Sequence, residues 1–337
     1  KIQNIPMIIT RTPFRISFFG GGTDYPQWFK EHGGSVLATT IDKYCYISCR
    51  FLPPFFDYKH RIVYAKIENV NNIDEIKHPS VRSVLKWSKV NKGVEIHHDG
   101  DLPSRSGLGS SSSFTVGLIK AVSALNGKMT NKECLAKDAI HIEQDIIHEN
   151  VGSQDQISAA YGGFNRITFQ PNGAFDVDPV IISNNRRREL HSHLMLFFTG
   201  FSRIASEIAE SQIKNLHNRK TELMRMREMV DEAIDLLRDQ KQPIEKFGTL
   251  LHESWQNKRK LSNKVSSAGI DSIYEAAIDS GAIGGKILGA GGGGFMLIFA
   301  KPEKHRIIKD RLNELVHVPF NFDDSGSRIT MYQPNEM

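Results

Sequence analysis

The chain has 337 residues, with 43 Lys and Arg against 38 Asp and Glu, so its formal net charge is +5. Charged residues make up 24% and apolar residues 39%, close to the average of globular proteins, which excludes a disordered chain. A charge of +5 over this length is too weak a field for a dedicated nucleic-acid binder. At roughly 150 residues per domain, the length predicts about two domains.

Membrane and secretory signals are not seen in the sequence. The longest apolar run of the C-terminal half, Phe295–Ala300, is far shorter than the roughly 18 residues of a membrane span. The N-terminal segment lacks the apolar region and cleavage site of a signal peptide. Cys45, Cys49 and Cys134 are too few for a disulfide scaffold, and no Cys or His cluster has zinc spacing. We therefore expect a cytoplasmic protein with reduced cysteines, no membrane partner and no all-protein metal site.

The first third of the chain is predicted to be rich in strands. Ile8–Phe18, Ser35–Phe51 and Arg61–Ile67 are β-branched and aromatic stretches separated by Gly, Pro and Asp. A helix is expected over Pro79–Val90 and a short strand over Gly93–His98.

Two amphipathic helices follow. The first is expected to begin near Ser110, and the second after Asn131, whose side chain is a favourable N-cap. In each, apolar residues recur three or four positions apart and so share one helical face. The two stripes are Phe114, Leu118, Val122 and Leu125, then Leu135, Ala139, Ile142 and Ile146. Further elements are expected as a helix at 154–160 and strands at 163–169 and 174–182.

The polar segment Ser183–Arg188 contains three consecutive arginines and is interpreted as a solvated linker between domains 1–185 and 186–337. Beyond it, strands and helices are mixed rather than strictly alternating, which indicates the α+β class. The expected elements are a strand at 193–198, helices at 203–218, 221–240, 243–259 and 270–280, two strands flanking a glycine loop within 286–300, a helix and terminal strands.

The first of three glycine-rich loops, Phe18–Asp24, comes directly after the strand that contains Arg15. Its three glycines allow the backbone to approach a ligand closely. A tight turn with Asp24 capping the next helix is an equally good interpretation of this loop alone.

The second loop, Pro103–Ser113, runs straight into the first amphipathic helix. Free backbone N–H groups and the positive end of the helix dipole meet there, which favours phosphate binding. The alternative is a flexible serine-rich linker, and the helix that follows argues against it.

The third loop, Gly289–Gly294, formally matches the dinucleotide motif G-x-G-x-x-G. That motif requires a helix after the loop, whereas Phe295–Phe299 reads as a buried strand, so the Rossmann interpretation fails. No Walker-type sequence occurs in the chain.

Two carboxylates complete the candidate set. Glu143 follows the apolar stripe residue Ile142 and can point inward, although most helix glutamates are exposed. Asp155 lies twelve residues later, where it could simply favour a helix N-terminus.

Together these features resemble the GHMP kinase superfamily, whose three motifs are matched in order by PFRISFFGGGTDY, PSRSGLGSSSS and KILGAGGGGF. The resemblance implies a two-domain fold with a ribosomal protein S5 domain 2-like N-terminal domain and a ferredoxin-like C-terminal domain. Within the superfamily, the chain is most similar to bacterial D-glycero-D-manno-heptose 7-phosphate 1-kinases. RTPFRIS, GGGTD, QDQ with GGFN, and TGFSR carry that similarity.

Galactokinases carry Gly-Glu-His-Thr-Asp in the first motif, where this chain has Gly21 and Gly22 in place of Glu and His. That difference argues for a bulkier or differently decorated sugar. A fucose, galactose or N-acetylhexosamine 1-kinase is the alternative. A non-catalytic sugar sensor is disfavoured because Arg15, Glu143 and Asp155 are all present.

The resemblance implies that ATP phosphorylates a sugar phosphate at its anomeric hydroxyl without a covalent enzyme intermediate, for nucleotide-activated heptose synthesis and surface polysaccharide. Asp155 would accept the hydroxyl proton, Arg15 would favour its ionised form, and Ser110 and Glu143 would hold Mg²⁺. The implied ATP-binding residues are Pro103, Ser106, Gly107, Leu108, Gly109, Ser110, Ser111 and Ser112. The implied substrate-binding residues are Gly21, Gly22, Thr23, Asp24, Arg203, Gly291, Gly292 and Gly293.

A substrate that already carries a phosphate needs a cationic anchor. Arg203, at an expected helix N-terminus, is the first choice, ahead of Arg11 and Arg105. Trp87 is interpreted as a core residue in preference to part of an adenine pocket. A small-molecule partner is expected, with no nucleic acid, for a monomer or homodimer.

Overall fold

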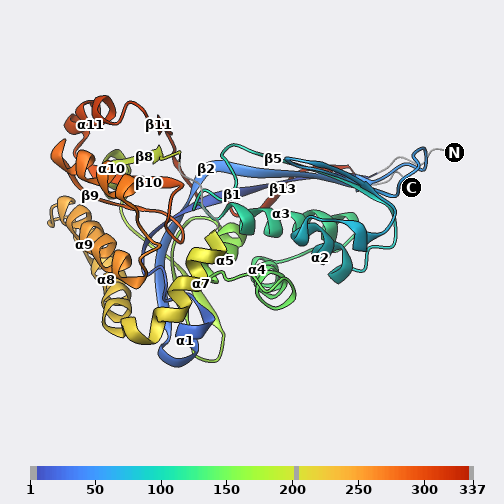
Figure 1. The fold of residues 1–337 in the computed structure, drawn as a ribbon, viewed down its shortest axis with the longest axis horizontal. Coiled ribbons are helices and arrows are strands. Elements are labelled where there is room, and N and C mark those ends of the chain that lie inside the picture. Colours follow the sequence, from blue (N-terminus) through green and yellow to red (C-terminus); the bar gives the residue numbers. More distant parts are fainter. Residues whose placement is uncertain (1–5, 201–204, 334–337) are drawn as a thin grey trace.

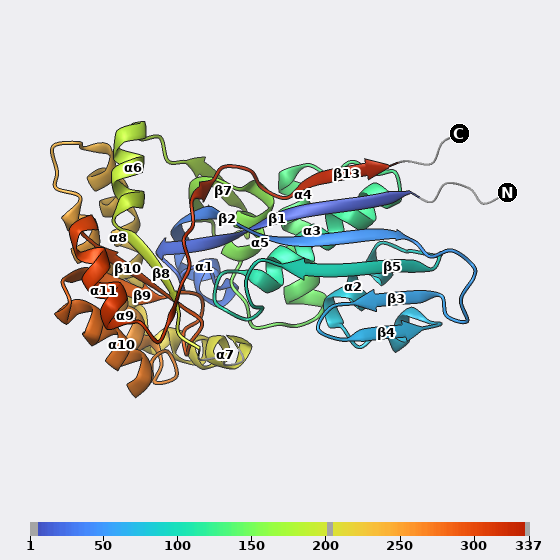
Figure 2. The same ribbon diagram turned by 90° about the horizontal axis from the view of Figure 1, so that it is seen from above.

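A computed structural model of the chain describes residues 6–200 and 205–333, which form two sheets covered by helices (Figure 1). The expected α+β class is confirmed. The larger sheet has nine strands in the order β13-β1-β2-β5-β3-β4, with β6 and β12 also on β2 and β7 on β6 (Figure 2). Its strands are β1 (Met7–Phe19), β2 (Gly34–Phe51), β3 (His60–Val63), β4 (Ile67–Val70), β5 (Val94–Gly100), β6 (Phe164–Phe169), β7 (Phe175–Pro179), β12 (Phe322–Asp323) and β13 (Arg328–Gln333).

The single strand expected over Arg61–Ile67 is wrong, because β3 and β4 form an antiparallel hairpin there. The chain reverses between them, where the N–H of Tyr64 donates to the carbonyl of Lys66 at 2.9 Å. A continuous run of strand-forming residues does not reveal such a short reversal.

Helices cover one face of this sheet (Figure 1). The four stripe residues of α3 are buried, and Asn131 caps α4 by accepting a 2.7 Å bond from the N–H of Cys134, both as expected. A π-helical turn over His141–Ile146 changes the helical phase, so Ile142 is buried but Ile146 is 39% exposed. The elements are α1 (Pro26–His32), α2 (Pro79–Trp87), α3 (Ser110–Leu125), α4 (Lys132–Ile140), α5 (Gln154–Tyr161) and the 3-10 turn Ile73–Glu75.

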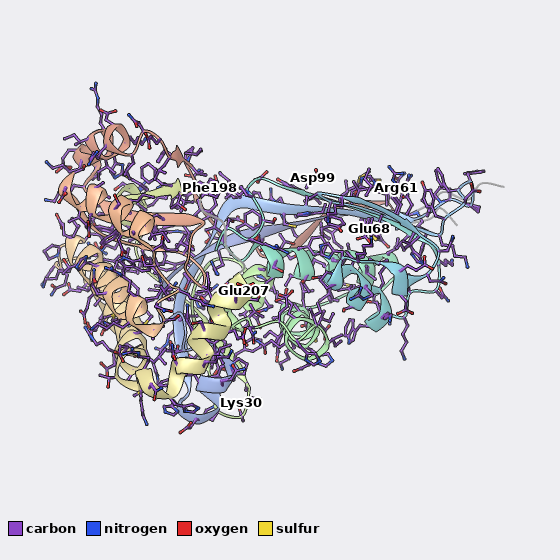
Figure 3. The ribbon with its side chains drawn as sticks, viewed as in Figure 1. Lys30, Arg61, Glu68, Asp99, Phe198 and Glu207 are labelled. Atoms are coloured by element: carbon purple, nitrogen blue, oxygen red, sulfur yellow. The ribbon has the colours of Figure 1, made fainter. Side chains whose placement is uncertain are left out.

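The smaller sheet has the antiparallel order β11-β8-β10-β9. Figure 3 labels Phe198 at the end of β8 and Glu207 on α7, a helix near the middle of the molecule. The strands are β8 (Leu194–Phe198), β9 (Ala282–Ile287), β10 (Phe295–Ala300) and β11 (Val316–His317). The helices are α7 (Ala205–Asn215), α8 (Lys220–Arg238), α9 (Glu245–Leu261), α10 (Ala268–Asp279) and α11 (His305–Arg311), with 3-10 turns at Leu216–Arg219 and Pro302–Lys304.

The interpretation of Ser183–Arg188 as a solvated linker is wrong, because these residues begin helix α6 (Asn184–Ser192). Arg186 is only 3% exposed, and its guanidinium donates to the carbonyls of Leu236 and Gln242 at 2.7 and 2.9 Å. The arginine therefore ties α6 to the end of α8 and the turn after it. Its partners are about fifty residues away, which local charge patterning cannot reveal.

The predicted domain boundary at 185/186 comes shortly before β8, the first strand of the second sheet. The last strands of the chain, however, do not belong to that second sheet. β12 and β13 return to the first sheet, where β13 pairs with β1 and β12 with β2. The division into 1–185 and 186–337 therefore stays a prediction about folding units.

Other expectations concern single side chains. Cys45 and Cys49 are buried in β2, and Cys45, Cys49 and Cys134 are all free cysteines. Trp87 is 37% exposed, so the core interpretation is wrong. Across residues 6–200 and 205–333, no helix is both long and apolar enough to cross a membrane.

Candidate active site

The three glycine-rich loops meet at one cavity, whose empty volume including its open mouth is about 940 Å³. The first and second loops, the N-terminal ends of α3 and α5, and parts of α7, α9 and β9 contribute to its walls. Segments that are far apart in the sequence therefore form one site.

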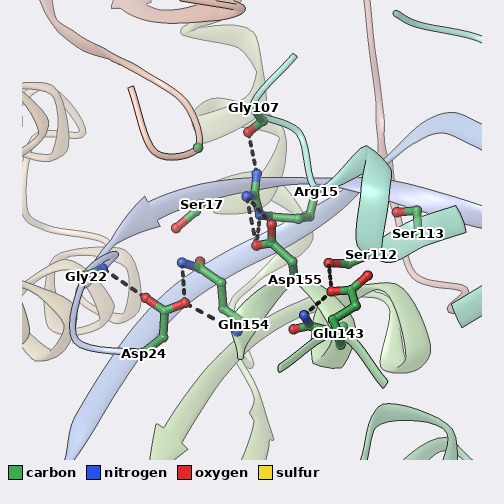
Figure 4. A network of polar contacts seen from close by, with 12 residues as sticks. Arg15, Ser17, Gly22, Asp24, Gly107, Ser112, Ser113, Glu143, Gln154 and Asp155 are labelled. Atoms are coloured by element: carbon green, nitrogen blue, oxygen red, sulfur yellow. Dashed lines mark hydrogen bonds and ion pairs between the residues drawn. The ribbon is translucent and has the colours of Figure 1, made fainter. Parts of the chain in front are cut away.

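Arg15 and Asp155 form a two-point ion pair at the centre of this cavity (Figure 4). The Nε and Nη2 atoms of Arg15 donate to the two carboxylate oxygens of Asp155 at 2.8 and 2.9 Å. The third nitrogen, Nη1, donates to the carbonyl of Gly107 at 2.7 Å. The arginine is 3% exposed, so the orientation of the carboxylate is fixed by β1 and the second loop together.

The second loop presents the N-terminus of α3 to the cavity. Gly109 is the N-cap residue and has a φ of +73°. A Cβ on it would lie 3.3 Å from Cγ of Arg15 and 3.5 Å from the carboxyl carbon of Asp155, so any other residue would be crowded there as well as strained by the positive φ. The expected cluster of Gly107, Gly109, Ser110, Ser111 and Ser112 lines the cavity. Free amides at this helix start can bind phosphate oxygens.

Three expected ATP-binding residues, Pro103, Ser106 and Leu108, do not line the described cavity. Leu108 is fully buried, and its carbonyl accepts from the N–H of Arg15 at 3.0 Å. The carbonyl of Ser106 accepts from the N–H of Phe295 at 3.1 Å. The backbone carbonyls of both residues therefore help to hold the loop in place.

Glu143 is fully buried directly behind Ser112, whose hydroxyl donates to its Oε2 atom at 2.8 Å. Gln156 also donates to Oε2, whereas Oε1 has no hydrogen-bond partner among the described residues. Burial, with a smaller contribution from Glu149, raises the pKa of Glu143 to about 7. A desolvated carboxylate with an unpartnered oxygen beside the phosphate-binding helix start fits an oxygen-preferring cation such as Mg²⁺.

The first loop places Asp24 in a buried part of the cavity wall (Figure 4). Its Oδ1 accepts from the N–H of Gly22 at 2.9 Å and its Oδ2 from the side-chain amide of Gln154 at 3.0 Å. Burial, together with nearby Asp155, raises the pKa of Asp24. The cap interpretation is wrong, because helix α1 has no side-chain cap.

Gly21 and Gly22 line the cavity as expected, but Thr23 does not. The hydroxyl of Thr23 donates to the carbonyls of Gly20 and Ser35 at 2.8 and 3.0 Å, and the residue is fully buried. Thr23 therefore stabilises the loop from behind.

The third loop packs against the second, because a Cβ on Gly289 would lie 2.5 Å from the Cα of Gly107. Gly289 and Ala290 line the cavity, whereas the expected Gly291, Gly292 and Gly293 do not. The N–H of Gly292 instead donates to the carbonyl of Val265 at 2.8 Å.

Comparison with known proteins agrees with this geometry. The family profile "GHMP kinases N terminal domain" matches residues 76–163, and "GHMP kinases C terminal" matches residues 232–317. A D-glycero-alpha-D-manno-heptose 7-phosphate kinase of Campylobacter jejuni is 34% identical, over 95% of this chain and 97% of that protein. The chain belongs to the GHMP kinases.

Two further relatives of this GHMP kinase are informative. The crystal structure of a D-glycero-D-manno-heptose 1-phosphate kinase from Bacteroides thetaiotaomicron superposes with a TM-score of 0.78 and 22% identity, covering 96% of this chain and 99% of that one. A bifunctional fucokinase/GDP-fucose pyrophosphorylase of Arabidopsis thaliana is 26% identical over 92% of this chain and 31% of its own length. The first supports the fold, and the second is a sugar kinase of another specificity.

The cavity-lining residues of this kinase that sequence reasoning did not assign include Ser17, Gln154, Lys258 and Lys286. Oγ of Ser17 and Oε1 of Gln154 are buried without a hydrogen-bond partner among the described residues, so both can bind a polar ligand. Lys286 stands at the start of the third motif, and that position was the one available signal for it. Ser17 and Gln154 lie within the stretches RTPFRIS and QDQ that carry the family resemblance, whereas Lys258 had no signal in the sequence.

The expected phosphate anchors have different outcomes. Arg203 lies outside the described residues. Arg11 does not line the cavity, because its guanidinium lies 4.1 Å from the ring centroid of Tyr44 on the sheet. Arg105 lines the cavity, and its N–H donates to the hydroxyl of Ser110 at 3.0 Å.

Proposed function

We propose that this GHMP kinase transfers the γ-phosphoryl group of ATP to the anomeric hydroxyl of D-glycero-D-manno-heptose 7-phosphate, which gives the 1,7-bisphosphate. The similarity that carries the proposal is the 34% identity with the Campylobacter jejuni heptose 7-phosphate kinase over nearly the whole of both chains. Gly21 also supports the proposal, because this cavity-lining residue has no side chain that would take up space needed by a large sugar.

In the proposed reaction, Asp155 accepts the proton of the anomeric hydroxyl as its oxygen attacks the γ-phosphorus. Arg15 holds the carboxylate by two hydrogen bonds and adds positive charge beside the transferring group. The amides at the start of α3 bind the phosphate chain, and Asp24, Ser17 and Gln154 orient sugar hydroxyls. Positioning and electrostatics supply most of the rate in this type of reaction.

Glu143 and Ser110 would hold Mg²⁺, which neutralises charge on the β- and γ-phosphates when it is bound. Glu143 is suited to this role by its unpartnered Oε1 and by the cost of burying its charge without a cation. The need for ATP suits a cytoplasmic enzyme, and the proposal includes that location. The product would serve nucleotide-activated heptose synthesis for surface polysaccharide.

A fucose 1-kinase is the second candidate, favoured by the 26% identity with the plant bifunctional fucokinase. ADP release measured over a panel of sugars separates the two. The panel contains heptose 7-phosphate, fucose, galactose and N-acetylhexosamines. The proposal predicts a kcat/KM for heptose 7-phosphate at least 100-fold above the others, and turnover of fucose alone contradicts it.

A further inference from the structure

Lys258 is a buried lysine in the last turn of α9 whose ammonium group faces the cavity. Lys258 as a whole is only 4% exposed. Its Nζ atom donates to the carbonyl of Ile287 at 3.3 Å and to the carbonyl of Gly289. An ammonium has three hydrogens, so one remains for a ligand in the cavity.

The charged side chains that line the cavity do not balance. Four of them are cationic and three are carboxylates. The guanidinium of Arg15 is already paired with Asp155. The ammonium of Lys286 donates to the carbonyls of Ser17 and Phe18 in β1 at 3.0 and 2.9 Å. Lys258 has no carboxylate partner among the described residues. The full set is Arg15, Arg105, Lys258, Lys286, Asp24, Glu149 and Asp155.

Lys258 extends from the side of the cavity that holds the first loop. Leu261, one turn further along α9, lies 3.5 Å from the position that a Cβ on Gly22 would take. The same side carries Ser17 and Gln154 with their unpartnered polar atoms. The α3 amides that suit ATP come from the second loop. Lys258 therefore stands between the first loop, which would hold the sugar, and Gly289 of the third loop, to which its ammonium donates.

We propose that Lys258 binds the phosphate group that the sugar already carries, and so selects phosphorylated over unphosphorylated sugars. This inference rests on the proposed function, since an unphosphorylated substrate would bring no anion to this position. A phosphate dianion would be the anionic partner that Lys258 lacks, and it would accept a charge-assisted hydrogen bond from the ammonium group.

Binding should also change the protonation of Lys258. Burial, with help from Arg15, lowers the pKa of Lys258 to about 7, and Asp24 and Asp155 oppose that shift. Lys286 also faces Lys258. A bound phosphate dianion raises the pKa of Lys258, so at pH 8 the protein takes up about one proton per sugar phosphate.

The test compares Lys258→Met with Lys260→Met, a control two residues along the same helix at an exposed position. In Lys258→Met the KM for heptose 7-phosphate should rise roughly 10- to 100-fold, the effect of losing one charge-assisted hydrogen bond. The KM for ATP and kcat should stay within about threefold of wild type, and Lys260→Met should match wild type.

Three outcomes overturn the proposal. A fall in kcat with unchanged KM values would assign Lys258 to the transferred phosphoryl group. Equal rises in both KM values would mean that it only holds the third loop through Gly289. Unchanged kinetics would remove it from the site altogether.

Titration calorimetry provides a second readout. Wild type and Lys258→Met are titrated with heptose 7-phosphate, without ATP, in two pH 8 buffers of different ionisation enthalpy. Proton uptake by wild type that is absent from Lys258→Met supports the proposal, and equal uptake by both refutes it. Turnover of unphosphorylated sugars alone by wild type would instead refute the proposed substrate, whereas turnover of sugar phosphate by wild type and Lys258→Met alike would refute only the role of Lys258.

Discussion

Asp155→Asn tests the chemistry of the site most sharply, because it keeps the shape of the side chain and removes its basicity. The carboxylate accepts two bonds from Arg15, at 2.8 and 2.9 Å. Asparagine keeps one oxygen and turns an NH₂ group toward the guanidinium, so one bond is replaced by two opposed donors. Removing a positioned general base slows a reaction about 10²- to 10⁴-fold, and we expect kcat to fall by that amount.

Nucleotide binding should survive, because the amides of α3 are untouched by Asp155→Asn. Breaking a buried ion pair costs about 3–5 kcal/mol, and this pair should cost less because the Asp155 side chain is 17% exposed. The assay measures ADP release for kcat and calorimetric titration for ATP affinity, with the exposed Asp178→Asn as control. If Asp155→Asn keeps more than a tenth of the wild-type kcat, Asp155 is not the base.

Three other predictions follow from buried groups. The pKa of Glu143 is about 7 in the folded chain, against an ordinary value of 4.5 for an exposed Glu, so its ionisation lowers stability as the pH rises from 4.5 through 7. Without Mg²⁺, Glu143→Gln should therefore be more stable than wild type at pH 8 by up to about 3 kcal/mol, and the gain should be smaller at pH 5. Urea unfolding of both proteins measures this difference, and a difference that does not change with pH would contradict the prediction. Gly20→Ala should give little folded protein, because its φ is +81° and a Cβ would lie 1.9 Å from the carbonyl oxygen of Ser35. Gly21→Ala, whose Cβ would be 3.6 Å or more from its neighbours, should fold and raise the KM for the sugar; equal yields of both variants would refute the reasoning. Arg186→Met should destabilise the fold by about 2–4 kcal/mol in urea, against less than about 0.5 kcal/mol for the exposed Arg188→Met, and equal effects would contradict the role of Arg186.

Sequence patterns predicted the helices and strands well where neighbouring residues determine the structure. Helix α3 begins at Ser110 as expected, because a glycine at the N-cap and a helical apolar stripe are both readable in sequence. The hairpin of β3 and β4 and the π-helical turn at His141–Ile146 were missed, because both depend on backbone geometry that residue types leave open.

Long-range contacts account for much of the fold and of the site that sequence reasoning missed. Arg186 bonds to carbonyls about fifty residues away, and Lys258 to the third loop about thirty residues away. A lysine inside a helix normally reads as exposed, so only its contacts reveal that it faces the cavity. The Arg15–Asp155 pair spans 140 residues and was expected from the family resemblance rather than from spacing.

The position of phosphorylation tests the central claim most directly. Wild-type protein is incubated with ATP, Mg²⁺ and heptose 7-phosphate, and the sugar product is followed by ³¹P and ¹³C NMR. The account predicts a product that keeps its original phosphate and gains a second one at C1. A new phosphate at any other carbon, or no product from heptose 7-phosphate while an unphosphorylated sugar is consumed, would contradict it.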